Sequence, residues 1–202
     1  MATTDTLNII SKMDEPVSKP YLPGDLAMWF FILAEMTVFA IFFLAFAVTR
    51  QLYPEMFQLG QSNLHPVAGA INTIALITSS FFVALSLNAI KQKKNRLSAM
   101  LIIAALLMAI LYIVVKSWEY NQLFELGFGL STNTYFTLYF FITAFHFMHV
   151  LLGMTILAFM AFRALKGEYQ NSSISGFESG ACYWHMVDLV WLILFPLLYV
   201  IH

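Results

Sequence analysis

Five long runs of uncharged, mostly apolar residues limit what this sequence can fold into. A helix needs roughly 20 apolar residues to cross the hydrocarbon core of a bilayer, where lipid leaves no backbone polar group without an internal partner. An α-helix meets this requirement, because all of its backbone hydrogen bonds form within the segment. They predict an all-α polytopic membrane protein, a bundle of five transmembrane helices with spans at about 26–49, 66–90, 97–115, 134–162 and 181–201.

The composition excludes several other classes of protein. The chain has 202 residues, of which 60% are hydrophobic and 10% charged, and a mean hydropathy of +0.78. A soluble domain has about 25% charged residues. The 20 Phe and 11 Met residues argue against disorder, and a net charge of -1 gives no basis for binding nucleic acid. The single cysteine, Cys182, can form neither an internal disulfide nor a thiolate metal cluster.

The distribution of basic residues predicts how the chain is oriented. Eight of the ten Lys and Arg residues lie in the N-terminal tail and in the links after the second and fourth spans, while the other face has only Arg50 and Lys116. Basic residues favour cytoplasmic loops, which places the N-terminus in the cytoplasm and the C-terminus on the opposite, periplasmic side of the membrane. We expect a cytoplasmic tail at 1–21, without the apolar segment of a signal peptide, and one transmembrane domain at 22–202.

Glu35 is a candidate site, because an ionisable group deep in a span is costly to keep there. It lies in the first predicted span with no charged residue near it in sequence. We expect it to be protonated or hydrogen-bonded to another helix. Two roles stay open: a neutral acid that packs against another span, or a group that handles protons or contacts lipid.

Two histidines share one face of the fourth predicted span. His146 and His149 are spaced i, i+3, and Gly153 follows on the same face. Imidazole binds zinc, copper and iron, and His185 of the fifth span could be a third ligand. The fourth span has no carboxylate or thiolate to complete such a site, so we favour hydrogen bonding between helices and predict no metal. Gly153 predicts close helix contact.

Other polar residues are predicted to support helix packing or to lie at an interface. Glu178, His185 and Asp188 form one stripe along the fifth span and must face protein, water or lipid head groups. Glu178 precedes the apolar run, which also allows a position at the membrane surface. Small polar residues that include Asn72 and Thr73 are typical of tight packing in the second span. Glu119, between Trp118 and Tyr120, is expected at the outer interface.

Several of these segments resemble subunit III of the haem-copper oxidases. The strongest match runs from Phe177-Glu178 through Tyr183-Trp184-His185-Met-Val-Asp188-Leu-Val-Trp191. A second is Phe145-His146-Phe-Met-His149-Val-Leu-Leu-Gly153. Supporting matches, in the order of the family, are Glu35 with its flanking phenylalanines, Asn72-Thr73 and Trp118-Glu119-Tyr120.

The resemblance implies an integral subunit that packs against subunit I and other oxidase subunits. Haem and copper are then expected in subunit I, with none in this chain, and bound phospholipid fits the family. The acid at the Glu35 position is linked in the family to proton uptake, and Arg163 matches an arginine that contacts lipid phosphate. Five-helix members occur in bacterial quinol oxidases and as accessory proteins of nitric oxide reductases, and the opening Pro23-Gly24-Asp25-Leu-Ala-Met-Trp29 favours the accessory type.

Four functions remain open at this point. The first is a non-catalytic subunit III of a terminal oxidase in the aerobic respiratory chain, which stabilises subunit I and supports its proton uptake. The second is an accessory protein of nitric oxide reductase. The others are an independent membrane metal enzyme built on the histidines and a transporter or proton channel, although no repeat suggests a transporter. No catalytic residue is predicted, and no site distinguishes cytochrome c from quinol as electron donor.

Overall fold

The computed structural model describes residues 25–170 and 174–201, and predictions for the 1–21 tail and for His202 lie outside them. The described residues form helices and no strand. The elements in chain order are α2 (Leu26–Leu52), α3 (Pro54–Gln61), α4 (Pro66–Lys91), α5 (Asn95–Glu125), α6 (Thr134–Leu165), the 3-10 turn η1 (Glu168–Gln170), α7 (Ser175–Phe195) and the π-helical turn η2 (Pro196–Val200).

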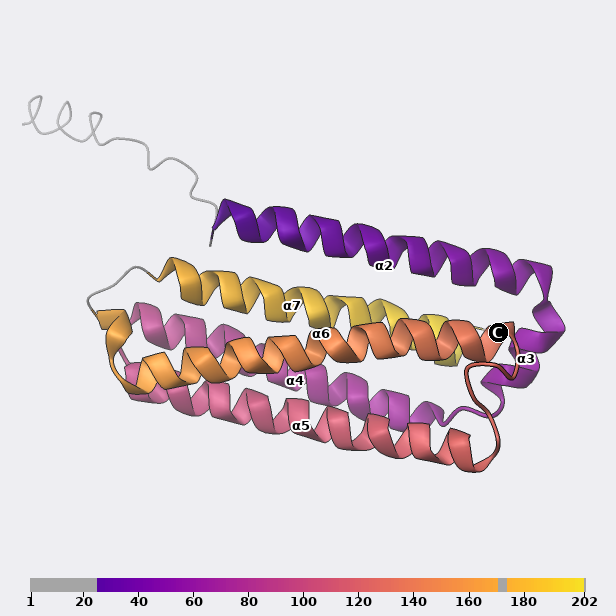
Figure 1. The fold of residues 1–202 in the computed structure, drawn as a ribbon. Helices are drawn as coiled ribbons and strands as arrows, with labels where there is room; N and C mark the ends of the chain where they lie inside the picture. Colours follow the sequence, from indigo (N-terminus) through magenta and orange to yellow (C-terminus); the bar gives the residue numbers. More distant parts are fainter. Residues whose placement is uncertain (1–24, 171–173, 202) are drawn as a thin grey trace, which may run out of the picture.

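Five of the described helices, counting α7 with η2, are long and apolar enough to cross a membrane, which confirms the predicted multi-pass membrane fold. In Figure 1, α2, α5 and α7 run in one direction and α4 and α6 in the other. The predicted orientation in the membrane stays a prediction. Two helices extend beyond the predicted spans: α5 continues past 115 to Glu125, and α7 begins at Ser175 before 181.

Local sequence signals account for the helix ends. Asp25 caps α2, its side chain accepting a hydrogen bond from the backbone N–H of Ala27 at 3.3 Å. Asn133 caps α6 in the same way, accepting from the N–H of Phe136 at 2.9 Å. Pro54 occupies the first position of α3, where its missing N–H removes no helical bond. The short helix α3 had not been predicted in the link between the first two spans.

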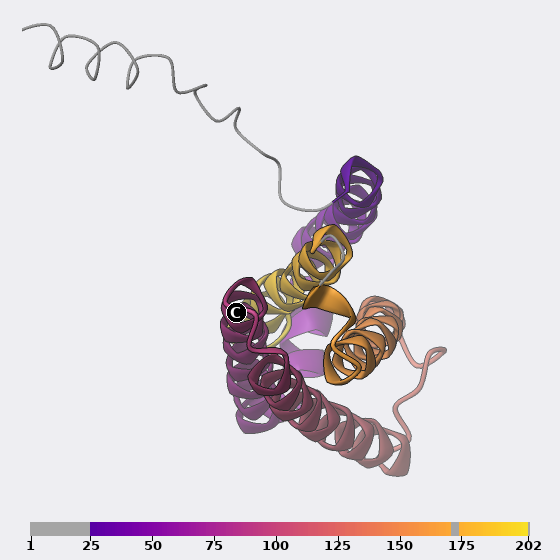
Figure 2. The ribbon, with the colours of Figure 1, turned by 90° about the vertical axis from the view of Figure 1, so that its left-hand side faces the viewer.

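The helix α2 lies at the edge of the bundle. Viewed along the helices, it lies next to α7, while α4 to α7 pack against one another (Figure 2). Only 17% of the most apolar part of α2 is buried, against 50% for the last span. Its outward face carries large apolar side chains such as Phe30, Leu33 and Leu44. Most of α2 is therefore available to lipid or to another protein.

Close packing joins α6 to α7 at Gly153. A Cβ atom at this position would lie 2.7 Å from Cε3 of Trp184 and 3.3 Å from Cε1 of Tyr183. Both aromatic side chains are buried. The close helix contact predicted at Gly153 is confirmed.

Candidate functional site

The central polar contact joins α2 to α6. Oε2 of Glu35 lies 3.0 Å from Nε2 of His149, and the two side chains are 21% and 10% exposed. This is the hydrogen bond to another helix that was expected of Glu35. Phe39 and Phe145 place their rings 5.3 and 4.6 Å from the His149 ring, so aromatic side chains surround the pair.

The other nitrogen of His149 determines how many protons the pair holds. Nδ1 lies 2.8 Å from the carbonyl oxygen of Phe145, and a carbonyl oxygen only accepts, so Nδ1 carries a hydrogen. The contact with Glu35 then requires one more proton, on either the carboxyl group or Nε2. Glu35 and His149 therefore share one proton inside the apolar part of the bundle.

His146 lies one turn away on the same helix but has different surroundings. Its ring is fully buried, 5.9 Å from the ring of Tyr112 and 5.3 Å from that of Trp191. Neither ring nitrogen has a hydrogen-bond partner within the described part of the chain. The described helices present aromatic rings to His146 in place of the hydrogen-bond partner that was favoured for it.

The stripe on α7 contacts α4. Nδ1 of His185 lies 3.0 Å from Oγ of Ser80, and Ser80 is also a hydrogen-bonding neighbour of Asp188. Oδ1 of Asp188 is buried without a partner among the described residues. His149 and His185 thus bind different partners, and residues 25–170 and 174–201 contain no group of three His, Cys, Asp or Glu side chains close enough to hold a metal ion.

Ion pairs lie where α4, α6 and α7 meet the predicted cytoplasmic surface. Nζ of Lys91 lies 2.9 Å from Oε1 of Glu178, a carboxylate that is 8% exposed. Nε of Arg163 donates to Oε2 of Glu168 at 2.6 Å, and the guanidinium group lies 5.1 Å from the Tyr169 ring. The Arg163 guanidinium keeps other N–H donors. Its contact with lipid phosphate stays a prediction.

Asn72 and Thr73 of α4 differ in their contacts. Oγ1 of Thr73 accepts a hydrogen bond from Nε1 of Trp191 at 3.0 Å and donates to the carbonyl oxygen of Gly69 at 2.8 Å. The side chain of Asn72 is fully buried, and neither amide atom has a partner in the described ranges. Thr73 thus joins α4 to α7, whereas Asn72 faces the interior of the bundle.

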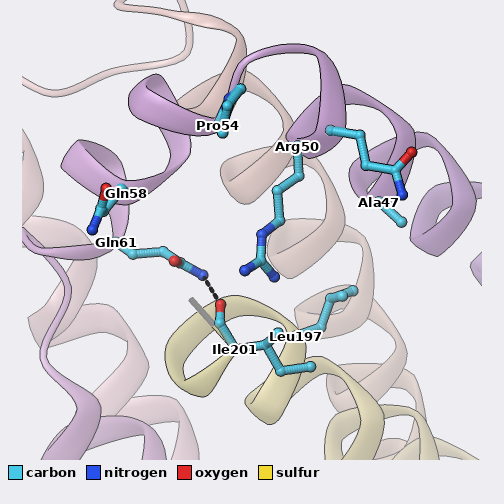
Figure 3. Close-up of a pocket in the computed structure, with 8 residues that line it drawn as sticks. Ala47, Arg50, Pro54, Gln58, Gln61, Leu197 and Ile201 are labelled. Atoms are coloured by element: carbon cyan, nitrogen blue, oxygen red, sulfur yellow. Dashed lines mark hydrogen bonds between the residues drawn. The ribbon is translucent and has the colours of Figure 1, made fainter.

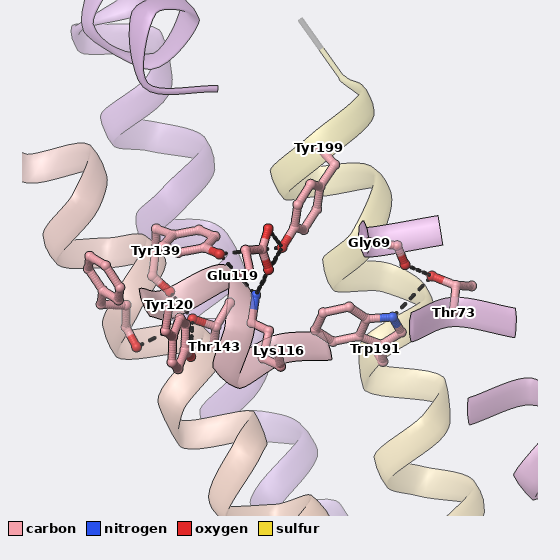
Figure 4. A network of polar contacts seen from close by, with 10 residues as sticks. Gly69, Thr73, Lys116, Glu119, Tyr120, Tyr139, Thr143, Trp191 and Tyr199 are labelled. Atoms are coloured by element: carbon pink, nitrogen blue, oxygen red, sulfur yellow. Dashed lines mark hydrogen bonds and ion pairs between the residues drawn. The ribbon is translucent and has the colours of Figure 1, made fainter. Parts of the chain in front are cut away.

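A buried ion pair at the outer end of α5 had not been predicted (Figure 4). Lys116 and Glu119 are fully buried, and Nζ of Lys116 lies 2.9 Å from Oε2 of Glu119. Lys116 also donates to the hydroxyl groups of Tyr139 and Tyr199, each at 2.9 Å. Tyr199 donates to the Glu119 carboxylate at 2.8 Å. Both charged groups thus help to pack α5 against α6 and η2, and the position of Glu119 at the outer interface stays a prediction. The i, i+3 spacing of opposite charges was the signal that could have shown the ion pair.

Comparison with known proteins identifies the family of this chain. Residues 22–202 match the family described as cytochrome c oxidase subunit III. Cytochrome c oxidase subunit 3 of Synechocystis sp. is 29% identical over 202 residues, covering 94% of this chain and 85% of that protein. The subunit 3 of Mus musculus is 32% identical over 179 residues, covering 85% and 67%.

The name of a third relative combines subunits I and III. The heme-copper oxidase subunit I+III of Aeropyrum pernix is 30% identical over 182 residues, which cover 87% of this chain and 22% of that protein. The matched segments include those that carry Glu35, His149, Glu178, His185 and Asp188. The chain belongs to the cytochrome c oxidase subunit III family of the haem-copper oxidases.

Proposed function

We propose that this chain is a non-catalytic subunit III of a haem-copper oxidase, packed against subunit I in the inner membrane of a bacterium. The relative named subunit I+III carries the proposal most directly, because its name joins the two subunits in one protein. Haem and copper belong to subunit I in this proposal, and this chain supplies no ligand to them. The complex works in the aerobic respiratory chain.

The Glu35–His149 pair is the group through which this chain supports proton uptake by subunit I. The pair shares one proton, and the Glu35 carboxyl group is partly exposed on α2, the helix least buried within the chain. A partly exposed acid that is hydrogen-bonded to imidazole can exchange its proton with a neighbouring water or side chain. The position of α2 at the edge of the bundle supports such an exchange with a partner subunit.

The proposal is tested by purifying the oxidase from cells with and without this chain. We expect the haem absorption spectrum and the initial turnover rate to stay unchanged without the chain, while activity declines sooner during continuous turnover. Re-expression of the full chain restores sustained turnover. Loss of the haem spectrum without the chain would contradict a supporting role, and so would an unchanged time course.

A further inference from the structure

A pocket at the opposite end of the bundle from Arg163 contains an arginine that the family comparison does not address. The pocket has a volume of about 500 Å³ and lies where α2 turns into α3, next to η2. It is lined by Arg50 and Gln51 of α2, Gln58 and Gln61 of α3, and Leu197 of η2, among others. Figure 3 shows these segments around the Arg50 side chain.

Hydrogen bonds that do not involve the Arg50 side chain hold the walls of this pocket in place. The Gln61 side chain is 6% exposed, and its Nε2 donates to the carbonyl oxygens of Leu198 at 3.2 Å and Ile201 at 3.0 Å. These bonds attach α3 to the end of the last span. The backbone N–H of Tyr53, between α2 and α3, donates to the Thr49 carbonyl oxygen at 3.0 Å. The pocket should therefore persist when the side chain of Arg50 is changed.

The charge in this pocket has no partner among the residues that the structure describes. The Arg50 guanidinium group points into the space between Gln61 and Leu197 (Figure 3), and no hydrogen bond or ion pair joins it to any described residue. None of the described lining residues carries a carboxylate. Lys116, the other base near this end, is buried and paired with Glu119. The guanidinium fork matches the geometry of phosphate, and the amide groups of Gln51 and Gln58 offer further donors.

We propose that this pocket binds a phosphate oxyanion, and that the group it binds is the head group of a phospholipid. Arg50 lies at the end of a membrane span, the depth at which phospholipid head groups lie. The apolar lining residues Ala47 and Leu197 lie toward the hydrocarbon side of this position, where the acyl chains begin. Free phosphate is also an anion, but it has no acyl chains that could contact these apolar residues. The proposal does not depend on an oxidase partner.

The test is a binding titration of the full chain, purified in mild detergent, with phosphatidylglycerol. Diacylglycerol with the same acyl chains is the ligand without phosphate. Arg50→Gln is compared with Arg96→Gln, which removes an exposed arginine at the other end of the bundle. We expect Arg50→Gln to weaken phosphatidylglycerol binding at least about tenfold, Arg50→Lys to weaken it less, and Arg96→Gln to leave it unchanged. Diacylglycerol binding should be the same in all four proteins.

A competition with inorganic phosphate separates the two sources of the oxyanion. Phosphatidylglycerol that stays bound in equimolar phosphate supports the phospholipid, whereas its displacement would overturn that assignment. Equal weakening by Arg50→Gln and Arg96→Gln would overturn the site itself. Circular dichroism of each variant checks the fold, and Arg50→Lys provides a second, more conservative variant should Arg50→Gln unfold.

Discussion

Lys116 and Glu119 lie one helical turn apart on α5 and form an ion pair 2.9 Å long in which both side chains are fully buried. Removing two charges from water is costly and is offset only when further hydrogen bonds satisfy both groups. Tyr139 of α6 and Tyr199 of η2 supply these bonds. The pair therefore fixes the position of α5 against two segments that are distant in sequence.

Breaking this pair from one side should destabilise the bundle strongly. Lys116→Met leaves the Glu119 carboxylate buried without its cation, and such changes cost about 3–5 kcal/mol. The double variant Lys116→Met/Glu119→Leu removes both charges and should lose less stability than the single one. The free energy of unfolding in detergent, measured by denaturant titration, checks the order. A single variant as stable as the double variant would show that the pair is not desolvated.

Adding a methyl group at Gly153 should loosen the contact between α6 and α7. Its Cβ would lie 2.7 Å from the Trp184 ring, and overpacking of this kind costs typically about 1–3 kcal/mol. Gly176→Ala is the matched control, because nothing lies within 4 Å of a Cβ at that position. The midpoints of thermal unfolding of Gly153→Ala and Gly176→Ala are compared. Equal midpoints would mean that α6 and α7 tolerate more separation than their packing indicates.

Substitution of Glu35 should separate its structural role from its role in proton transfer. Glu35→Gln keeps a hydrogen-bonding group beside His149 but cannot release a proton, whereas Glu35→Ala removes the contact. In the purified oxidase we expect both variants to keep the haem spectrum and to lose activity sooner during turnover. Normal turnover in Glu35→Gln and early loss in Glu35→Ala would instead assign Glu35 to packing alone.

The two histidines of α6 should respond differently to replacement by phenylalanine. His146→Phe keeps ring contacts with Tyr112 and Trp191 and loses no hydrogen bond to a described residue, so its stability should change by less than about 1.5 kcal/mol. His149→Phe loses its bonds to Glu35 and to the Phe145 carbonyl and should cost about 1–3 kcal/mol. Denaturant titration of the two variants makes the comparison. A larger loss in His146→Phe would point to a partner of His146 outside the described chain.

The number of spans could be predicted from the sequence, because each span is a long uncharged run. The burial of the charged residues near the end of α5 could not be predicted in this way. Charged residues usually mark the membrane surface, and Lys116 and Glu119 were interpreted in that way. Their mutual neutralisation within the bundle depends on Tyr199, which lies 80 residues beyond Glu119. No local pattern reports such a contact.

The candidate site was predictable in its residues more than in its contacts. Glu35 and His149 stood out because ionisable groups are costly inside a span. That they bind each other, across 114 residues of sequence, follows only from the packing of α2 against α6. The position of His146 and His149 on one helical face suggested similar roles. Instead, the His149 ring faces the Glu35 carboxyl group, and the His146 ring faces aromatic rings. The roles of Glu35 and Arg163 in proton uptake and lipid binding stay predictions.

The most direct measurement of the central proposal is the absorption spectrum of whatever purifies with this chain. The full chain, tagged and extracted in mild detergent, should bring with it a protein that shows the haem and copper content of an oxidase subunit I and that reduces oxygen. Purification with a nitric oxide reductase would contradict the oxidase assignment. Purification of the chain without any haem protein would contradict its role as a subunit.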